Sequence, residues 1–593
     1  MSIAISDVWP DRASYHPGES ARIKLRLTHT AEALPIVEVH LRLTWLQQVV
    51  SETRQPVHLS SGLETASELP LELPGVAFRG YGVEARIYDS AGSVVSQRST
   101  ALDVLARWSQ APRYGFISEY PQGDTPGAAV AVAESLARYH INIAQFYDWM
   151  WRHYALMPPT DDFSEALGRQ LSLSAVRARV AACRSQGIAA YGYAAVYGAE
   201  PEYSRKHPDE VVYDTDGKPY SLGEFFDIMN IAPGTSWRAR IIATMREAVR
   251  DVPFDGLHLD QYGMPRGPAF DATKQPLDFP SDFASFTDEA RAAIQQPDRD
   301  VGAIFNAVEN WPIEQVANTT QDAVYIEVWP PYVNYQDLRA LIVNARRLAP
   351  AKQVILAAYM KPLGEAQDTA ALALAEAATR FTSATIWASG GSHLLLGEVD
   401  AALHEAYYVN HTRLRGAFAA VMRAYYDFVT RYLNVLCDLR LTAAAPPVAK
   451  AIGPVAQVAV AGQTVTEEAT AGAVWAIART MPGYLTVSLI NLTSATSTEW
   501  NAPAAPPAEL INLEATIRLT NAPRARGVYA ATPDAGDGAL VALEYSAAQG
   551  AADDQELTFT LPSLHYWTLI LVEFEPANDE PDATNLESNA RHD

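Results

Sequence analysis

Eight short apolar segments alternate with helical patterns between residues 106 and 435, and this alternation constrains the fold more than any other feature. Each segment is short enough for a buried strand, and ordinary helix start signals such as Asp124 with Pro126, Ser236 and Asp368 stand between them. Eight strand–helix units in about 320 residues predict a (β/α)8 barrel. The predicted strands are RYGFISEY (113–120), INIAQFYDW (141–149), GIAAYGYAAVYG (187–198), DGLHLDQYG (255–263), VGAIFNAVEN (301–310), DAVYIEVWP (322–330), QVILAAYM (353–360) and TSATIWASGG (382–391). The long apolar stretch 402–433 is predicted to be the eighth helix.

The two ends of the chain show a different pattern, in which apolar and polar residues alternate over short runs between Pro, Gly and Ala-rich turns. Residues 1–105 therefore predict an immunoglobulin-like β-sandwich, and residues 436–575 predict a second antiparallel β-sandwich. The last stretch, 576–593, is acidic and free of aromatic residues, which is typical of a disordered tail. The expected architecture is a multidomain protein with a central barrel, 106–435, and two flanking sandwiches.

Charge and cysteine content exclude several classes of function. The net charge of −24 over 593 residues disfavours nucleic acid and anionic membranes as partners, because like charges repel. A neutral or cationic ligand fits better, and we expect a monomer. The only cysteines, Cys183 and Cys437, lie far apart in apolar settings, so a disulfide framework and a cysteine metal cluster are excluded.

The sequence carries no visible signal for a membrane or a secretory route. No window of about 18 apolar residues occurs, so a transmembrane helix is not expected. The first twenty residues have neither the basic nor the continuous apolar region of a signal peptide. A cytoplasmic location and a removed leader both remain open.

Candidate site residues follow from the barrel, because such barrels build their sites at the C-terminal ends of the strands. Carboxylates, aromatic residues and amides dominate these ends, and neither a metal-binding cluster nor a phosphate-binding glycine loop occurs there, so no metal or cofactor is predicted. This makeup is typical of a carbohydrate site, in which aromatic rings stack on sugars and two acids perform the chemistry. The candidates are Asp148, Trp149, His153, Tyr193, Asp260, Gln261, Asn306, Glu327, Trp329 and His393.

The two-residue period of a strand indicates which acids point into the barrel. Asp260 shares a face with His258, and Glu327 shares a face with Tyr325, while the leucine, valine and isoleucine neighbours face the helices. Taken alone, an aspartate at a strand end such as Asp260 is more often a loop or helix cap than a catalytic group. We interpret His258 as a structural polar group. Strands four and six lie two apart, so the spacing leaves both a retaining and an inverting glycosidase open.

Six segments in the same order make the chain resemble glycoside hydrolase family 66, the dextranases and cycloisomaltooligosaccharide glucanotransferases. The segments are DRASYHPGE near the start, GFISEYP, QFYDWMWRHY, the Asp of DGLHLDQYG, the Glu of YIEVWP, and ASGGSHLLLGE. The resemblance implies that Asp260 is the nucleophile and Glu327 the general acid/base. It also implies an α-1,6-linked glucan such as dextran as substrate, and net retention through a covalent glycosyl-enzyme.

Within that family the sequence favours hydrolysis over cyclisation. The resemblance implies that cyclising members carry a carbohydrate-binding module inserted in the catalytic domain, whereas the link MKPLGEAQD after the seventh strand is short. The expected activity is endo-cleavage of dextran to isomaltooligosaccharides. The alternatives are the glucanotransferase, another exo-acting α-glycosidase, and a polysaccharide-binding protein without catalysis.

Overall fold

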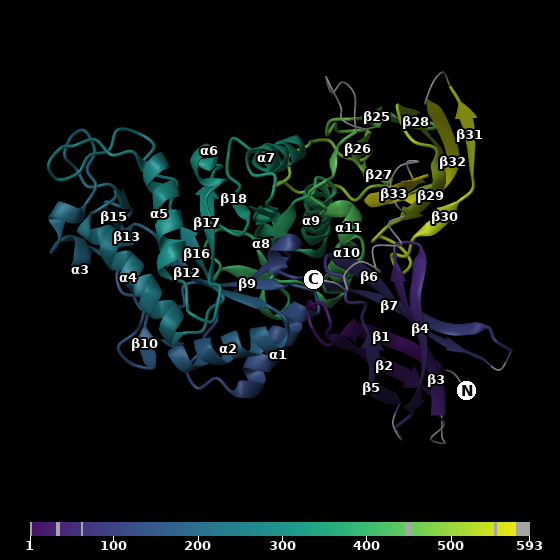
Figure 1. Ribbon diagram of the computed structural model, residues 1–593, viewed down its shortest axis with the longest axis horizontal. Coiled ribbons are helices and arrows are strands. Elements are labelled where there is room, and N and C mark those ends of the chain that lie inside the picture. The colour runs from purple at the N-terminus through teal and green to yellow at the C-terminus, as the bar shows by residue number, and fades with distance from the viewer. Residues whose placement is uncertain are drawn as a thin grey trace, which may run out of the picture.

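The computed structural model describes residues 3–30, 36–60, 63–89, 91–444, 454–550 and 554–576 (Figure 1). Its centre is a nearly closed barrel of eight parallel strands, which confirms the predicted barrel. A bridge between Phe116 and Gly397 joins the first strand to the chain that follows the last one. The strands lie in the order β8 (Tyr114–Ile117), β9 (Ile143–Phe146), β12 (Ala189–Ala195), β16 (Gly256–Asp260), β17 (Gly302–Val308), β18 (Val324–Glu327), β19 (Val354–Ala357) and β20 (Ser392–Leu394). The predicted tail lies, beyond residue 576, outside the described residues.

Both faces of the barrel strands are buried, which explains why their sequences are almost continuously apolar. Tyr114, Ile304 and Tyr325 belong to a cluster inside the barrel. Leu257 and Ile326, at alternate positions, pack outward in the larger cluster shared with the helices. The side-chain direction therefore follows the two-residue period, as the sequence indicated.

Helices cover the outside of the barrel, and their caps lie close to the predicted start signals. Asp368 caps its helix by accepting from the backbone N–H of Ala371, whereas Thr125 and Thr235 cap the helices expected to start at Asp124 and Ser236. The long helices are α1 (Pro126–Ala137), α2 (Leu173–Ser185), α4 (Ser236–Asp251), α5 (Phe279–Ala293), α7 (Tyr335–Leu348), α9 (Thr369–Ala388) and α10 (Gly416–Arg431). The short ones are α3 (Pro201–Ser204), α6 (Ile313–Val316), α8 (Lys361–Glu365) and α11 (Leu433–Leu436). No helix in the described ranges is both long and apolar enough to cross a membrane.

The predicted eighth strand, TSATIWASGG, is wrong. Helix α9 continues to Ala388, and the strand begins only at Ser392, after the turn at Gly390, whose φ is +86°. Residues 382–388 are nevertheless all buried, because α9 packs between the barrel and the C-terminal sheets. An apolar run of that length does not distinguish a buried helix from a buried strand.

The predicted eighth helix, 402–433, is correct only in its second half. Its first half is a hairpin of β21 (Ala401–Leu403) and β22 (His411–Arg413), and α10 begins at Gly416. The apolar residues of the hairpin, Leu403 and Tyr408 among them, are buried in the cluster inside the barrel. Because these residues pack inside the barrel, their apolar character does not indicate a helix.

The N-terminal region consists of two antiparallel sheets that share one core cluster. Along β2 every second side chain is buried, as the alternating sequence predicted. The immunoglobulin-like assignment of this region stays a prediction. One sheet contains β1 (Ile3–Pro10), β2 (Ser20–His29) and β5 (Glu64–Glu72), and the other contains β4 (Gln48–His58), β3 (Ile36–Trp45), β6 (Arg79–Tyr88) and β7 (Val94–Val104).

The C-terminal region also has two main sheets around one core cluster. Figure 1 shows this region, in yellow, beside the purple N-terminal region on the same side of the barrel, and a hydrogen bond of 2.9 Å from Gln47 Nε2 to Glu573 Oε2 joins the two. The assignment of the C-terminal region as a β-sandwich stays a prediction. One sheet contains β23 (Thr442–Ala443), β25 (Val465–Thr466), β26 (Val474–Met481), β27 (Tyr484–Asn491), β33 (Trp567–Phe574), β29 (Ala525–Ala531) and β30 (Val541–Leu543). The other contains β24 (Val455–Val460), β28 (Leu510–Thr520), β32 (Gln555–Leu564) and β31 (Tyr545–Gln549).

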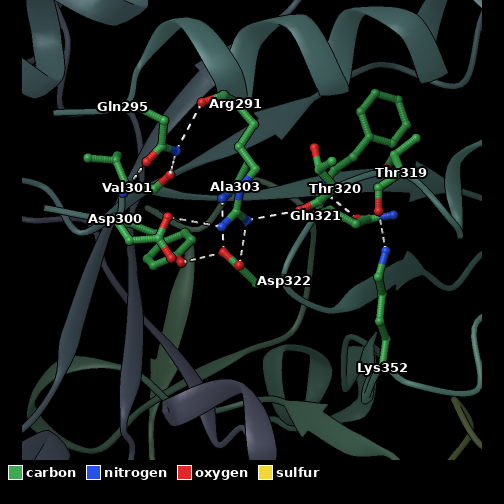
Figure 2. Close-up of polar contacts among 12 residues, drawn as sticks. Arg291, Gln295, Asp300, Val301, Ala303, Thr319, Thr320, Gln321, Asp322 and Lys352 are labelled. Carbon is green, nitrogen blue, oxygen red and sulfur yellow. Dashed lines mark hydrogen bonds and ion pairs between the residues drawn. The ribbon is translucent and has the colours of Figure 1, made fainter. Parts of the chain in front are cut away.

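At the N-terminal end of the barrel, which we call the base, Asp322 links three elements (Figure 2). Its carboxylate accepts hydrogen bonds from Tyr191 Oη on β12 at 2.7 Å and from the backbone N–H of Ala303 on β17 at 2.9 Å. Arg291 on α5 completes the set with an ion pair at 2.5 Å, and it also donates to the carbonyl of Thr320. This network fastens α5 to the base of the barrel.

Candidate active site

An arc of hydrogen bonds crosses the C-terminal end of the barrel, which we call the mouth. The arc runs from β12 to Tyr359, which follows β19. Tyr193 Oη donates to Asp260 Oδ2 at 2.8 Å. Asn306 Nδ2 donates both to Asp260 Oδ1 at 2.7 Å and to Glu327 Oε2 at 2.8 Å. Tyr359 Oη donates to Glu327 Oε1 at 2.9 Å. Four neighbouring strands and the segment after β19 thus supply one connected arc that is centred on two carboxyl groups.

The register of the strands explains why these side chains meet. Asp260 pairs with Ala195 on β12, and Glu327 pairs with Val308 on β17, so both acids lie at matching strand ends. Their partners on the same faces, His258 and Tyr325, lie inside the barrel. The predicted inward direction of both acids is therefore confirmed.

The two carboxyl groups are close together. Because one oxygen of Asp260 and one of Glu327 both lie within 2.8 Å of Asn306 Nδ2, these oxygens are at most about 5.5 Å apart. A separation of this size leaves no layer of bulk water between the acids. They therefore interact directly.

Burial raises the pKa of both acids. Desolvation, reinforced by the charge of Glu327, raises the pKa of Asp260 to about 7. Desolvation also raises the pKa of Glu327, while hydrogen bonds from Asn306, Tyr359 and Trp329 oppose the rise. Among the described residues no lysine or arginine pairs with either acid, so the pair favours a single negative charge near neutral pH.

Asp148 is a third carboxyl at the mouth, on the chain that leaves β9. Its backbone has a φ of +43°, a conformation that is unfavourable for a non-glycine residue, and Arg169 Nη2 donates to its carbonyl at 2.9 Å. Its carboxyl oxygens accept no hydrogen bond from any described residue, and burial raises its pKa to about 6. Such a group can accept hydrogen bonds from a ligand.

His153 lies near Asp148 and is held by a buried acid that the sequence analysis did not select. His153 Nδ1 and Glu200 Oε1 are 3.0 Å apart, and the backbone N–H of His153 donates to the same oxygen. The ring of Phe226 covers the imidazole at 4.1 Å between centroids. This arrangement fixes the direction of the imidazole beside the mouth.

Trp329 is the one predicted aromatic candidate with a largely open face. It is 37% exposed and meets the ring of Tyr359 edge-on at 5.9 Å. Since Tyr359 bonds Glu327, the indole lies at the rim directly beside the second acid. Its free face is available for stacking on a sugar ring.

Two predicted binding residues, Trp149 and Gln261, do not reach the mouth. Trp149 is fully buried, packs on Phe254 at 4.8 Å, and donates its indole N–H to the carbonyl of Tyr193. Gln261 is 1% exposed and donates to the carbonyl of Asn306 at 3.1 Å. Both residues brace the backbone behind the arc, so the prediction that they touch the substrate is wrong for this geometry.

His393 also differs from the prediction, because its strand starts later than expected. Within β20 it pairs with Leu356, which faces the helices. Its Nδ1 lies 3.0 Å from Ser383 Oγ on α9, and burial lowers its pKa to about 4. A shift of the strand by a few residues thus turns this histidine from the mouth to the helix layer. His258 likewise stays neutral, since burial lowers its pKa to about 3.

Sequence reasoning missed Tyr408, which the β21–β22 hairpin brings into the barrel. Its hydroxyl lies 3.0 Å from that of Tyr325 and 3.5 Å from that of Tyr359. Its ring stacks on Tyr147 at 4.4 Å. The segment was assigned to a helix, and no local pattern marks one of two adjacent tyrosines as an inward residue.

Comparisons with known proteins place the chain among carbohydrate-active enzymes. The sequence model described as glycosyl hydrolase family 66 matches residues 10–571. A cycloisomaltooligosaccharide glucanotransferase of Niallia circulans is 24% identical over 738 residues, which cover 99% of this chain and 74% of that protein. A dextranase of Streptococcus salivarius is 25% identical over 577 residues, covering 83% of this chain and 67% of that protein.

A solved structure has the same fold. The crystal structure of a Paenibacillus sp. cycloisomaltooligosaccharide glucanotransferase complexed with cycloisomaltoheptaose matches with a TM-score of 0.87 at 22% identity. The match covers 96% of this chain and 100% of that chain. The multidomain fold around a parallel barrel is therefore shared with that protein.

Proposed function

The chain belongs to glycosyl hydrolase family 66, and from this premise we propose that it is an endo-acting, retaining dextranase that cleaves α-1,6-glucosidic linkages to isomaltooligosaccharides. The observation that carries the proposal is the arc in which Asn306 Nδ2 binds Asp260 and Glu327 together. Because the two oxygens held by Asn306 are at most about 5.5 Å apart, the arc supports the close spacing of about 5–5.5 Å that is typical of retaining enzymes.

In the first step Glu327 donates its proton to the glycosidic oxygen while Asp260 attacks the anomeric carbon. The bond to the leaving sugar breaks and a glycosyl ester of Asp260 forms. The two acids share one proton, which in the reacting state lies on Glu327, so the single negative charge of the pair is on Asp260 before this step and on Glu327 after it. Because the charge moves from one carboxyl to the other, the two repelling anions never coexist.

In the second step the carboxylate of Glu327 takes a proton from water as the water oxygen attacks the anomeric carbon. The ester bond breaks, Asp260 leaves as carboxylate, and Glu327 is protonated again. Asn306 donates to both acids, so it can stabilise the negative charge at either position. Tyr193 and Tyr359 hold the outer oxygens of the two carboxyls.

We assign substrate binding to Asp148, His153 and Trp329 around these acids. Asp148 has carboxyl oxygens without a protein partner, and Trp329 offers an open ring face beside Glu327. These groups match the hydroxyls and the apolar faces of a neutral glucan. No metal or cofactor has a role in this scheme.

Cyclising transfer is the second candidate, because the relatives with the highest coverage carry that name. The link from β19 to α9 supports hydrolysis instead, since α8 (Lys361–Glu365) nearly fills it and leaves no inserted module there. Digestion of dextran, pullulan and starch, followed by mass analysis of products, separates the candidates. Mixed linear isomaltooligosaccharides from dextran support the proposal, while cyclic products or glucose alone would replace it with the transferase or an exo-enzyme.

A further inference from the structure

A cavity of about 430 Å³ lies away from the barrel mouth, where the N-terminal sheets, the end of α10 and the C-terminal region meet. Arg42 on β3, Arg86 on β6 and Arg431 on α10 line it, together with Glu84 on β6. Among the described residues that line the cavity, Glu84 is the only acid. A protein with a net charge of −24 thus encloses a local excess of positive charge.

Glu84 does not neutralise the three arginines. Its Oε2 lies 3.2 Å from Arg42 Nη1 and 2.7 Å from Arg86 Nη2, and its Oε1 lies 3.3 Å from Arg431 Nη2. Glu52 lies 3.7 Å from Arg42 but is 40% exposed and does not line the cavity. One buried carboxylate therefore serves three guanidinium groups.

Arg431 has buried donors without acceptors. Its side chain is 4% exposed, and neither its Nε nor its Nη1 finds a hydrogen-bond partner within the described part of the chain; the same holds for Nε of Arg86. A buried N–H group without an acceptor is unfavourable. Both arginines line the cavity, which has room for an anion.

The backbone of β6 leaves space for the Arg431 guanidinium at Gly82. A Cβ atom at position 82 would lie 2.4 Å from both Cζ and Nε of Arg431, so only glycine permits this approach. Thr44 Oγ1 accepts from Arg431 Nη2 at 3.1 Å and fixes the plane of the group. The position of the guanidinium is thus determined by the strands around it.

We propose that this cavity binds a small oxyanion of the phosphate class. Planar guanidinium groups bind phosphate oxygens through paired N–H donors, and three of them converge here around a single carboxylate. Since the arginines come from two N-terminal strands and from α10, and Tyr529 and Leu540 of the C-terminal region complete the lining, the bound anion holds the three regions together. The site is independent of the proposed catalytic function.

Thermal unfolding of the full chain in potassium phosphate and in potassium chloride of equal ionic strength tests the proposal. Binding to the folded state alone should raise the Tm by about 1–3 °C, saturating with phosphate concentration. Phosphate also stabilises proteins through exclusion from their surface, so the specific effect is the difference between variants in the same buffer. The double variant Arg42→Gln/Arg86→Gln should lose the saturable part and keep dextran cleavage.

The matched control is Arg54→Gln/Arg98→Gln, which removes the same charge from exposed positions on β4 and β7 outside the cavity. This control should retain the wild-type response. If the first double variant does not fold, the single variant Arg86→Gln should weaken phosphate binding at least about fivefold by titration calorimetry. A phosphate response that is equal in all variants, or absent from the wild type, would overturn the proposal.

Discussion

The two ends of the barrel use the same strand in different ways. Tyr191 and Tyr193 are two residues apart on β12, and their hydroxyls donate to Asp322, which precedes β18, and to Asp260, the last residue of β16. At the base Tyr191 meets Asp322, whose charge is neutralised by Arg291. At the mouth Tyr193 meets Asp260, whose neighbours are neutral donors and a second carboxyl.

This difference separates a structural acid from a reactive one. An aspartate that forms an ion pair with arginine fastens two elements together. An aspartate that faces another carboxyl in a buried site has a raised pKa, and strong perturbations of this kind concentrate at functional sites. The two neighbouring buried carboxyl groups at the mouth therefore destabilise the folded protein, and paired charges elsewhere compensate for this loss.

The largest contrast is expected for activity. Asp260→Asn should lower kcat on dextran by about 10⁴-fold or more, because the nucleophile is removed. Asp322→Asn at the base should change kcat by less than about twofold, because it lies outside the mouth. Reducing-end assays with both variants, together with circular dichroism to verify folding, measure the contrast. Normal cleavage by a folded Asp260→Asn variant would refute the assignment of the nucleophile.

Stability should show the opposite contrast. Asp322→Ala leaves the mostly buried Arg291 without its main partner, which should lower the free energy of unfolding by about 2–3 kcal/mol. The double variant Asp322→Ala/Arg291→Met should recover part of the loss. Urea unfolding measures both, and an unchanged midpoint in Asp322→Ala would mean that the base network adds nothing to stability.

The pH dependence of the folding stability should reflect the titration of Asp260 at the mouth. Burial and Glu327 raise the pKa of Asp260 from 3.8 to about 7, so the folded protein retains a proton that the unfolded chain releases in that window. Wild-type stability therefore falls as the pH rises from 3.8 to about 7. Asp260→Asn lacks this loss, so its Tm should exceed that of the wild type at pH 8 and converge with it near pH 4. A Tm difference that does not vary with pH would contradict the raised pKa.

The two tyrosines should give the smallest effects. Tyr193→Phe removes a hydrogen bond that lowers the pKa of Asp260, so the acidic limb of the pH–rate profile should move to higher pH and kcat should fall about tenfold. Tyr191→Phe should cost about 1 kcal/mol of stability and leave the profile unchanged. Equal pH profiles for both variants would show that the mouth tyrosine does not tune the acid.

Local patterns predicted the barrel and the direction of its two central acids. The alternation at Asp260 and Glu327 fixed which face of each strand they occupy, since side chains on a strand point alternately to opposite sides. The same reasoning failed at His393, where the strand begins after Gly390 and not before it. The two-residue period indicates which face of a strand a side chain occupies only when the first residue of the strand is known.

The sequence did not predict which side chains are buried or which residues from distant parts of the chain come into contact. Trp149 stands next to Asp148, yet its ring lies in the core and only the aspartate reaches the mouth. Tyr408 enters the barrel because a hairpin replaces the first half of the expected helix. The arginine-lined cavity combines residues as distant as Arg42 and Arg431.

The sequence by itself determined the first seven barrel strands, the family, and the inward direction of Asp260 and Glu327, because these depend on patterns within one segment. Only the tertiary structure decided that Asn306 binds both acids, that Asp260 has no cation while Asp322 has one, and which aromatic rings remain open. These features depend on distances between strands and on the surroundings of each charge. Hydrogen bonds and pKa values arise from such neighbours in space, and a linear pattern does not contain them.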